Sequence, residues 1–339
     1  MAEKQGKVTI YDVAALAGVS VSSVSRVLHQ VPNVRADVRD RVEKAIQVLE
    51  YVPNRTAQML KTHRSYMLAH IVADVTQPQY VQLHRRLRAE AEQRGYQMIL
   101  FDADKDSRRV DRFLRENVDR ADGVICSARN INEEVTDALK NCGVPVVFTH
   151  NCEQQQFDAC YPDPAQGPQL SLEHLLALGH RRIAFVATAE DEKLNAAHLA
   201  AYRETLENAG IAVDEALIRC ADDLMTCGYR SGISLAALEN PPTAIYTAND
   251  IVAVGVIQAM RDLHWDVPGK MSVTGEGDSS IGRDMTPAMT TVSDPAEGIC
   301  ETVIDYLLDR VEGRYDGPAR IAKLREQKLI VRGSTGCAK

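Results

Sequence analysis

From residue 66 onward, short apolar segments that fit buried strands alternate with longer segments that fit helices. The first set predicts strands at 66–72, 97–101, 123–126 and 145–149, separated by helices at 81–94, 108–117 and 133–141. The second set predicts strands at 183–187, 244–247 and 272–275, with helices at 168–178, 194–209, 229–238 and 250–263. Because such alternation forms doubly wound α/β folds with parallel sheets, two sets predict two lobes. Ligands in these folds bind outside the carboxyl ends of the strands.

Composition narrows the class of protein further. With 339 residues, 45% of them hydrophobic and 25% charged, the chain is typical of a soluble globular protein with two or three domains. Its longest apolar segments, such as 144–148, are far shorter than a membrane span, and no apolar segment of a secretory signal follows Lys7. We therefore expect a cytoplasmic protein without membrane contact.

Neither the cysteines nor any short motif indicates an enzyme. No two of the eight cysteines are three residues apart, so they fit single buried thiols in a reducing compartment rather than a metal or redox site. The glycines at 275 and 277 lack the third glycine of a dinucleotide loop, and no phosphate loop, nucleophile elbow or paired metal ligands occur. The sequence thus predicts no catalytic residues, no metal and no cofactor.

Charge is distributed unevenly along the chain, whose formal net charge is −8. Residues 1–64 contain ten basic and six acidic side chains, a net charge of +4, so the remainder carries −12. A basic head on an acidic body indicates that the first segment binds a polyanion while the rest has another task.

The basic head has the pattern of a helix-turn-helix. Apolar residues at helical spacing predict a helix at 10–17, which Thr9 caps and Gly18 ends. Ser20 then caps a second helix, and a third helix near 35–49 completes a small all-α core.

The exposed side of the second helix suits the major groove of DNA. Its hydroxyl groups can hold phosphates, and the Arg26 guanidinium fits the O6 and N7 atoms of guanine. The side chains on this face are Val21, Ser22, Ser23, Ser25 and Arg26.

These motifs resemble those of the LacI/GalR family of transcription regulators. The matching stretches are Val8-Thr-Ile-Tyr-Asp-Val-Ala-Ala-Leu-Ala-Gly-Val-Ser-Val-Ser-Ser-Val-Ser-Arg-Val-Leu28, Arg39-Asp-Arg-Val42, Tyr51-Val-Pro-Asn54 and Ala57-Gln-Met-Leu60. The resemblance implies that Val21, Ser22 and Arg26 read bases. It also implies contacts with the DNA backbone, or support for them, from Tyr11, Ser20, Ser23, Ser25 and Asn54.

Two residues of the head depart from the family pattern. His29 stands where many members have Asn, and Arg35 stands where Ser or Thr usually begins the third helix. The candidate DNA-binding residues are Thr9, Tyr11, Ser20, Val21, Ser22, Ser23, Ser25, Arg26, His29, Asn54, Ala57 and Leu60.

Residues 53–60 resemble the hinge helix of the family. A helix of this length is too short to be stable alone, so we expect it to form when two copies pack together on DNA. The resemblance implies that Leu60 wedges between base pairs from the minor groove and bends the operator.

The body resembles the effector domain of the same family, which has the periplasmic-binding-protein fold. Matching landmarks are Glu173-His-Leu-Leu-Ala-Leu-Gly-His180, Thr247-Ala-Asn-Asp250, Pro287-Ala-Met-Thr-Thr-Val292 and Ile330-Val-Arg-Gly-Ser334. The resemblance implies a head at 1–53, a hinge helix and linker at 54–65, and an effector-binding and dimerisation domain at 66–333. Its N-terminal lobe would be about 66–163 and 294–320, and its C-terminal lobe about 164–293 and 321–333.

The same resemblance places an effector cleft between the lobes. The implied effector-binding residues are Asp74, Thr76, Pro78, Tyr80, Ser127, Arg129, His150, His198, Cys227, Asn249, Glu276 and Asp294. Members that bind free hexoses typically use an arginine and an aspartate where this chain has His198 and Gly277.

Several effector types fit this set of residues. His150 and Arg129 could receive a phosphate or carboxylate, although Asp74 would repel an anion near it. A disaccharide or sugar derivative held by Asp74, Glu276 and Asp294 is equally compatible.

We therefore expect a sequence-specific transcription regulator, most consistent with a repressor, whose DNA affinity is set by a free sugar, sugar phosphate or sugar acid. Its partners would be a pseudo-palindromic double-stranded operator, the effector and a second copy of the chain, at the nucleoid in the cytoplasm. No heptad repeat follows Val331, which favours a dimer over a tetramer.

The alternative functions are a stand-alone sugar-binding protein, which the missing secretory signal disfavours, and a doubly wound enzyme with a DNA-binding head. Induction and co-repression are both compatible with the sequence.

Overall fold

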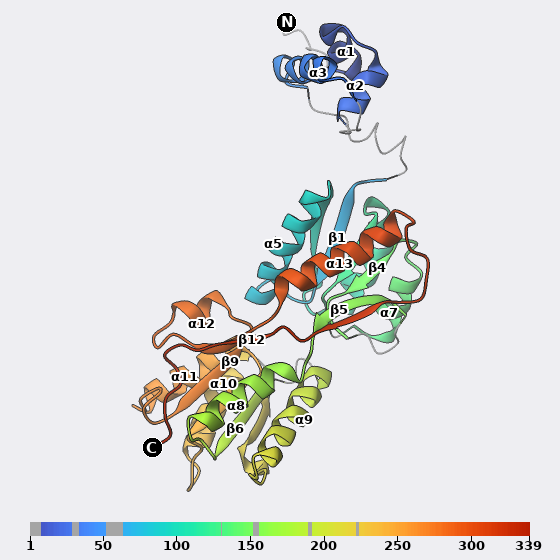
Figure 1. Ribbon diagram of the computed structural model, residues 1–339. Helices are drawn as coiled ribbons and strands as arrows, with labels where there is room; N and C mark the ends of the chain where they lie inside the picture. The colour runs from blue at the N-terminus through green and yellow to red at the C-terminus, as the bar shows by residue number, and fades with distance from the viewer. Residues whose placement is uncertain are drawn as a thin grey trace, which may run out of the picture. The chain divides into compact units, whose positions relative to one another are not determined.

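The computed structural model describes residues 8–28, 34–51, 64–129, 131–151, 156–188, 192–221 and 224–339. By its internal contacts the chain divides into two units, Met1–Ser65 and Tyr66–Lys339 (Figure 1). Each unit has its own hydrophobic core, so each is described separately.

The first unit is the predicted helix-turn-helix. The helices of its described residues are α1 (Ile10–Ala17), α2 (Val21–Leu28) and α3 (Ala36–Val48). Gly18 ends α1 with a φ of 63°, a left-handed conformation that glycine adopts without strain. The buried faces of the three helices meet in one core made of Val13, Ala14, Ala17, Val24, Val27, Val42, Ala45 and Tyr51.

The second unit contains two six-stranded sheets, which confirms the predicted pair of α/β lobes. The first sheet has the order β11-β5-β4-β3-β1-β2, and all its strands are parallel. Its strands are β1 (Met67–Val72), β2 (Gln97–Asp102), β3 (Gly123–Cys126), β4 (Val146–Phe148), β5 (Asp158–Pro162) and β11 (Ile321–Leu324). Its helices are α5 (Pro78–Gln93), α6 (Ser107–Glu116), η1 (Val118–Arg120), α7 (Glu133–Lys140) and α13 (Ala296–Val311).

The second sheet has the order β12-β10-β9-β8-β6-β7, and within it only the pair β10 and β12 is antiparallel in the part of the chain that is described. Its strands are β6 (Ile183–Thr188), β7 (Ile218–Ala221), β8 (Ala244–Thr247), β9 (Ser272–Glu276), β10 (Thr290–Ser293) and β12 (Lys328–Ile330). Its helices are α8 (Gln166–Ala177), α9 (Glu192–Asn208), η2 (Glu215–Leu217), α10 (Leu224–Ala236), α11 (Asp250–Asp262) and α12 (Ser280–Asp284).

The chain passes between the lobes after β5, after β10 and after β11. The third passage lies later than expected, because β11 pairs with β5 in the first sheet. Residues 321–324 therefore belong to the N-terminal lobe, and the change of lobe follows Leu324.

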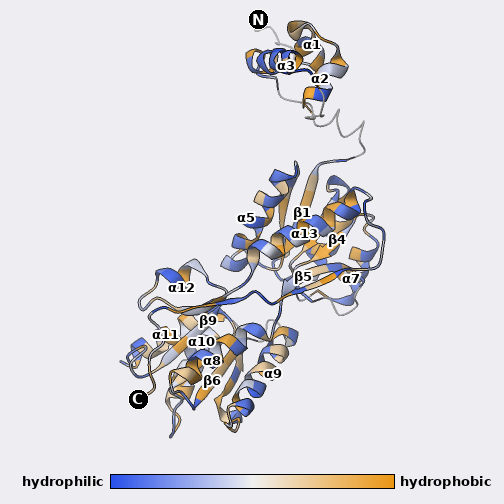
Figure 2. Cartoon of the chain, in the orientation of Figure 1, coloured by the Kyte–Doolittle hydropathy of each residue, from blue (hydrophilic) through white to orange (hydrophobic). Residues whose placement is uncertain are grey.

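Helices cover both faces of each sheet, so each lobe has two apolar layers. Figure 2 shows hydrophobic residues concentrated on the strands. In the first lobe, one layer packs against α6 and α7 and the other against α5 and α13. In the second lobe, the layers pack against α10 with α11 and against α8 with α9. The two-layer burial explains why the central strands are continuous apolar runs.

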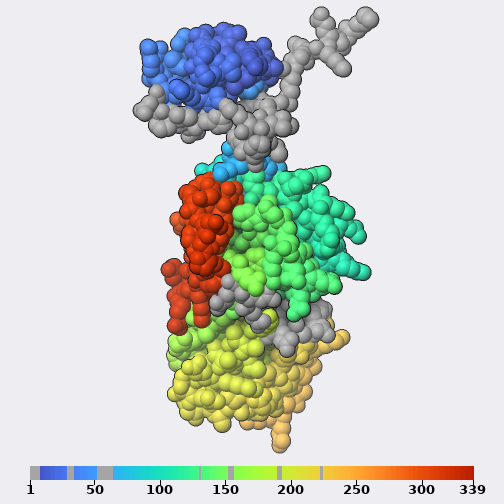
Figure 3. Space-filling view, turned by 90° about the vertical axis from the view of Figure 1, so that its right-hand side faces the viewer, coloured from blue at the N-terminus to red at the C-terminus, as the bar shows by residue number. Residues whose placement is uncertain are grey.

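An ion network joins segments of the first lobe that are distant in sequence. The Asp158 side chain is fully buried at the start of β5, and both of its oxygens accept hydrogen bonds. Arg310 of α13 donates two bonds of 2.9 Å, and Arg320 donates from its backbone and its guanidinium at 2.7 to 3.3 Å. Figure 3 shows the C-terminal part of the chain, which includes α13 and β11 and is drawn in red, lying against the green middle of the chain.

In the second lobe, two glycines let α10 and α11 approach backbone to backbone. A Cβ atom on Gly228 would lie 2.0 Å from the carbonyl oxygen of Val252, and one on Gly255 would lie 2.2 Å from that of Met225. Only glycine permits such a close approach.

Two expectations concerned the burial of the cysteines and the lack of a membrane-spanning helix. The seven described cysteines are free, but Cys220 and Cys337 are exposed, so the expectation that all are buried was wrong. Among the described residues, no single helix is both long and apolar enough to cross a membrane, although the bent pair α1 and α2 reaches that length and composition together.

Candidate functional site

The candidate DNA-binding face lies on α2. Ser22 and Arg26 are exposed, whereas Val21, Ser23 and Ser25 are half-buried. The buried residues of α2, Val24 and Val27, point into the head core and hold this face outward. The arrangement leaves the Arg26 guanidinium accessible to a groove edge.

Hydroxyl groups gather at the first turn of α2. Ser20 Oγ lies 2.8 Å from Ser22 Oγ and 2.9 Å from Ser23 Oγ, and it accepts a bond of 3.2 Å from the Ser23 backbone N–H. This cap satisfies one orphan N–H of the helix and places three hydroxyls where a phosphate can bind.

Of the remaining candidate DNA-binding residues, the structure describes Tyr11 and Thr9. Tyr11 is 71% exposed on α1, where it is free to reach a phosphate. Thr9 donates from its backbone N–H and its hydroxyl to Asp12 Oδ2 at 2.8 and 2.7 Å, so its described role is to begin α1. His29, Asn54, Ala57 and Leu60 lie outside the described residues.

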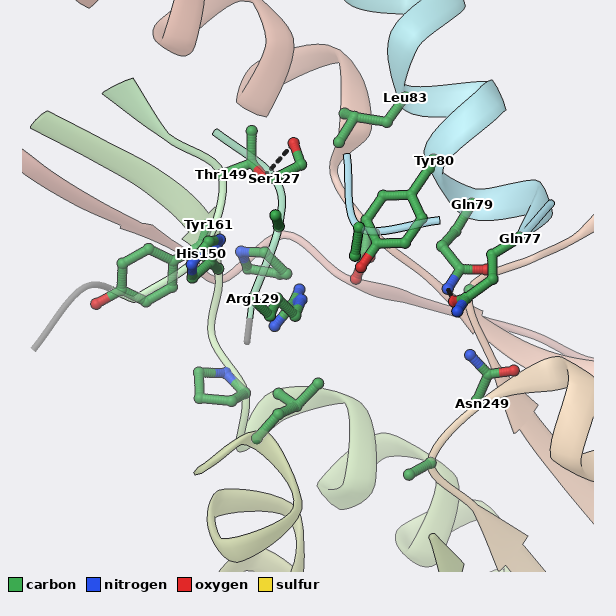
Figure 4. A pocket seen from close by; sticks show the side chains of 18 of the residues that line it. Gln77, Gln79, Tyr80, Leu83, Ser127, Arg129, Thr149, His150, Tyr161 and Asn249 are labelled. Atoms are coloured by element: carbon green, nitrogen blue, oxygen red, sulfur yellow. Dashed lines mark hydrogen bonds between the residues drawn. The ribbon is translucent and has the colours of Figure 1, made fainter. Parts of the chain in front are cut away.

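The candidate effector cleft is a cavity of about 930 Å³ between the two lobes. Its walls follow the carboxyl ends of strands of both sheets, as expected for a doubly wound fold. Figure 4 shows side chains of the N-terminal lobe converging from α5 and from the loops after β3 and β4, with Asn249 facing them from the other lobe. Of the predicted residues, the cavity is lined by Tyr80, Ser127, Arg129, His150, His198, Asn249, Glu276 and Asp294.

Four predicted cleft residues do not line this cavity. The Asp74 carboxylate turns back on its own loop, where it accepts from the backbone N–H and hydroxyl of Thr76, at 2.9 and 2.5 Å. Pro78 is the first residue of α5, and Gln77 and Gln79 occupy that wall instead. Cys227 is fully buried in the core of the second lobe, with its thiol 3.3 Å from the Ala187 carbonyl oxygen. The prediction of Asp74, Thr76, Pro78 and Cys227 as wall residues was therefore wrong.

His198, Tyr246 and Glu276 form a buried polar cluster at the cleft. Tyr246 donates to Glu276 Oε2 at 2.8 Å, and its oxygen lies 3.3 Å from His198 Nδ1. With Tyr246 as the donor to Glu276, the contact of Tyr246 with His198 is a hydrogen bond only if His198 carries its proton on Nδ1. His198 Nε2, which is 3.6 Å from Glu276 Oε1, is then an acceptor. The resemblance implies an arginine donor at this position in members that bind free hexoses, whereas this tautomer of His198 presents an acceptor.

Two of the carboxyl groups that line the cleft, Glu276 and Asp294, have raised pKa values. Burial, followed by repulsion from Asp294, raises the pKa of Glu276 to about 8. Desolvation by the cleft walls also raises the pKa of Asp294, although the residue itself is exposed and a bond of 3.0 Å from Gln327 Nε2 and the charge of Arg129 oppose the shift. Glu276 is therefore largely protonated at neutral pH.

His150 is a neutral imidazole on the opposite wall. Burial lowers its pKa to about 3, and the charges of Arg129 and Lys193 act in the same direction. Its ring meets Phe148 edge-on at 5.1 Å, and its Nδ1 atom has no hydrogen-bond partner among the described residues.

Sequence reasoning missed several residues of this site. Tyr246 lies inside a predicted strand, where it was counted only as part of an apolar run, and Gln327 follows a strand that was not predicted. Gln77, Gln79 and Tyr161 also line the cleft, and the polar residues that follow the first strand were the signal that could have identified the glutamines.

The arrangement suits the binding of a small polar molecule. Aromatic rings, amides, hydroxyls, neutral imidazoles and carboxyl groups surround a volume that fits a small polar molecule. Among the described residues, no group of three or more His, Cys, Asp or Glu side chains could hold a metal ion.

Glu276→Gln is expected to stabilise the protein relative to the wild type at high pH. Since the folded-state pKa of Glu276 lies above its ordinary value, the wild type loses stability as pH rises between about 4.5 and about 8. Glutamine keeps an acceptor for Tyr246 without titrating. Urea unfolding at about pH 5, 7 and 9 should show a stability difference that grows in favour of the variant and levels off near pH 9. A difference that is the same at all three values would contradict the raised pKa.

Comparison with known proteins agrees with this description. Residues 9–54 match the lacI family of bacterial regulatory proteins, and residues 172–335 match a periplasmic binding protein-like domain. The chain is 30% identical to catabolite control protein A of Priestia megaterium, over 85% of this chain and 88% of that protein.

Two solved structures resemble the whole chain. One is a complex of the transcriptional regulator CelR with cellobiose, with a TM-score of 0.72, 27% identity and coverage of 96% of this chain and 99% of that one. The other is the lac repressor dimer bound to operator and the anti-inducer ONPF, with a TM-score of 0.77, 25% identity and coverage of 97% and 99%.

A helix-turn-helix head and a two-lobed binding domain in one chain define a ligand-responsive DNA-binding regulator. The chain belongs to the LacI family of bacterial transcription regulators.

Proposed function

We propose that this protein is a repressor that binds a pseudo-palindromic operator as a homodimer and responds to a small carbohydrate-like effector in the cleft. The observation that carries the proposal is the pairing, in one chain, of an exposed Arg26 on α2 with a polar cavity between two α/β lobes. The lac repressor and CelR complexes support it, because the first contains an operator and the second contains cellobiose. We infer further that the protein acts in the cytoplasm and is not an enzyme.

The proposed mechanism couples two sites through the segment between them. Two heads would occupy successive major grooves, with the hinge segments at the minor groove between half-sites. An effector that favours one arrangement of the lobes would then order or release the hinge segments. Such coupling typically amounts to about 1–3 kcal/mol.

The site residues are assigned within this proposal. Arg26, Val21 and Ser22 would read bases, while Ser20, Ser23, Ser25 and Tyr11 would contact phosphates. Tyr80, Ser127, Arg129, His150, His198, Asn249, Glu276 and Asp294 would surround the effector, together with Gln77, Gln79 and Gln327.

The domain boundaries follow the same scheme. We propose a head at 1–53, a hinge helix and linker at 54–65 and an effector domain at 66–333. Within this effector domain, the pairing of β11 with β5 favours placing residues 321–324 in the N-terminal lobe.

Fluorescence anisotropy with the full-length protein tests the proposal. Duplexes selected from a random pool should yield a pseudo-palindromic site that binds tightly and loses affinity steeply with added salt. Adding cellobiose, ribose and other sugars should change that affinity for at least one compound. Binding no stronger to the selected site than to random DNA would refute the regulator function.

Arg26→Ala is expected to lower affinity for the selected site by about 1–3 kcal/mol and to relax specificity at one base pair of each half-site. The guanidinium is exposed on α2 and can form a bidentate contact with guanine. Binding to a set of single-base operator variants measures the effect.

Lys44→Ala is a matched control, because it removes the same charge from an exposed position on α3. It should weaken all operator variants by a similar, small factor. If Arg26→Ala also weakens all of them uniformly, the residue contacts phosphate and does not read a base.

A further inference from the structure

A chain of hydrogen bonds runs from the cleft wall through the first sheet to α5. Thr149 Oγ1 donates to Ser127 Oγ at 2.8 Å, and Ser127 Oγ lies 2.8 Å from His70 Nε2. His70 Nδ1 in turn lies 3.2 Å from His84 Nδ1, with the two ring planes only 7° apart. The chain thus links two wall residues to a helix on the other side of β1.

The side chains of this hydrogen-bond chain are largely shielded from water. Ser127 and Thr149 line the cavity, as Figure 4 shows, yet they are only 2% and 7% exposed, and His70 on β1 is fully buried. His84 is half-buried on α5. Water can therefore compete for these bonds mainly at the His84 end, and an unpaired proton elsewhere in the chain is costly.

Both histidines are neutral at pH 7. Burial lowers the pKa of His70 to about 3, and burial together with the Arg88 charge lowers the pKa of His84. A neutral imidazole has one donor nitrogen and one acceptor nitrogen, so the direction of each bond in the chain fixes the next.

Counting protons selects one direction. If Ser127 donates to His70 Nε2, then His70 carries its proton on Nδ1 and donates it to His84 Nδ1, and every proton between Thr149 and His84 Nδ1 has an acceptor. In the opposite direction Ser127 accepts from both Thr149 and His70. Its own proton then has no acceptor in the protein among the described residues and is left to whatever occupies the cavity, which is the less favourable arrangement for a hydroxyl that is only 2% exposed.

We propose that His70 and His84 are positioning residues that hold the Ser127 proton away from the cavity, so that the wall formed by Ser127 and Thr149 offers a ligand only hydrogen-bond acceptors. A sugar hydroxyl supplies the donor that such a wall requires. A carboxylate or phosphate oxygen at the same place has no proton to give. The preference for an uncharged polyhydroxy ligand rests on the proposed function of the cleft. The direction of the hydrogen bonds from Thr149 to His84 does not depend on that function.

Two-bond ¹H–¹⁵N spectra of the full-length protein labelled with ¹⁵N-histidine test the direction. We expect His70 with its proton on Nδ1 and His84 with its proton on Nε2, both assigned through single histidine variants. The reverse pattern in the ligand-free protein would overturn the proposal.

A pair of variants at His84 separates positioning from simple packing. His84→Gln keeps a carbonyl acceptor for His70, so the proton of His70 should stay on Nδ1. His84→Lys presents only donors, so the proton of His70 should move to Nε2. Both residues are good helix formers at this half-buried position, so both variants should fold. An unchanged His70 in His84→Lys would contradict the proposed role of His84.

Thermal-shift titrations with cellobiose, ribose, galactose and the corresponding aldonates test the ligand preference. A sugar that binds the wild type should bind about tenfold more tightly than its aldonate, the size of one hydrogen bond, and His84→Lys should narrow that ratio where His84→Gln does not. An aldonate that binds more tightly than its parent sugar would overturn the acceptor wall. If no compound shifts the melting temperature, the effector function fails, while the spectra still decide the direction of the chain.

Discussion

Replacing Asp158 with Asn is expected to lower the free energy of unfolding by about 3–5 kcal/mol, the cost of leaving buried charges without their partner. The carboxylate is completely buried and receives hydrogen bonds from Arg310 and Arg320, whose side chains are only 21% and 19% exposed. Asparagine has nearly the same shape but no charge, and its amide would direct protons at a guanidinium. The effect is large because β5, β11 and the end of α13 are all held by this one group.

Urea unfolding followed by circular dichroism measures this loss. Asp305→Asn is a matched control, because Asp305 also pairs with an arginine, Arg94, but is 52% exposed, so its loss should cost less than about 1 kcal/mol. Similar values for the two variants would show that burial does not strengthen the Asp158 network.

The ion network around Asp158 should also make the free energy of unfolding depend on pH. Burial alone would raise the pKa of Asp158, but the hydrogen bonds from Arg310 and Arg320 outweigh it and hold the pKa below its ordinary value. The network therefore contributes its full amount to the stability of the fold above about pH 4. This contribution declines as the pH falls through the folded-state pKa of Asp158. The stability gap between wild type and Asp158→Asn should shrink in acid, whereas a gap independent of pH would contradict the lowered pKa.

Gly228→Ala should be the second strongly destabilising change, by about 3 kcal/mol or more. The added Cβ would lie 2.0 Å from a backbone carbonyl oxygen of α11, and a backbone atom cannot rotate away as a side chain can. Overpacking of a core usually costs about 1–3 kcal/mol, and α10 and α11 would have to separate. The melting temperature and the solubility of the variant report the effect.

Gly298→Ala gives the control for this substitution. Gly298 is also in a helix, α13, but its nearest neighbour would be a Leu324 side-chain atom at 3.4 Å, and alanine is the better helix former by about 0.8–1 kcal/mol. This variant should be unchanged or slightly more stable. If Gly228→Ala behaves in the same way, the close approach of α10 and α11 is not required for stability.

Most of the fold followed from residue patterns, and the exceptions share a physical cause. Central strands such as β1 and β6 are buried on both faces and read as apolar runs, and all three helices of the head were predicted. The edge strands β7, β11 and β12 are half-exposed and mixed in composition, so they carry no such signal. The buried strands β5 and β10 were also missed, because Asp158 and the threonines of β10 are polar residues satisfied by partners distant in sequence.

The site was predicted less completely than the fold. Eight of the residues that family resemblance assigned to the cleft line the cavity, since their positions after strands are fixed by the topology, and their contact with an effector stays a prediction. It failed at Asp74 and Cys227, because the direction of a side chain depends on local contacts that a motif does not encode. The partnership of His70 with His84 was equally invisible, because it depends on how α5 packs across β1.

The composition of the first lobe has a consequence for synthesis on the ribosome. Its sheet and its helical layer need α13 and β11, which are translated only after every strand of the second lobe except β12. The head can fold soon after it emerges, whereas the N-terminal lobe stays incomplete, with the apolar surface for α13 uncovered, until Leu324 has left the exit tunnel. Chains that terminate early would therefore carry a folded head without a finished first lobe, and this exposed surface would direct them to chaperones and proteases rather than to DNA.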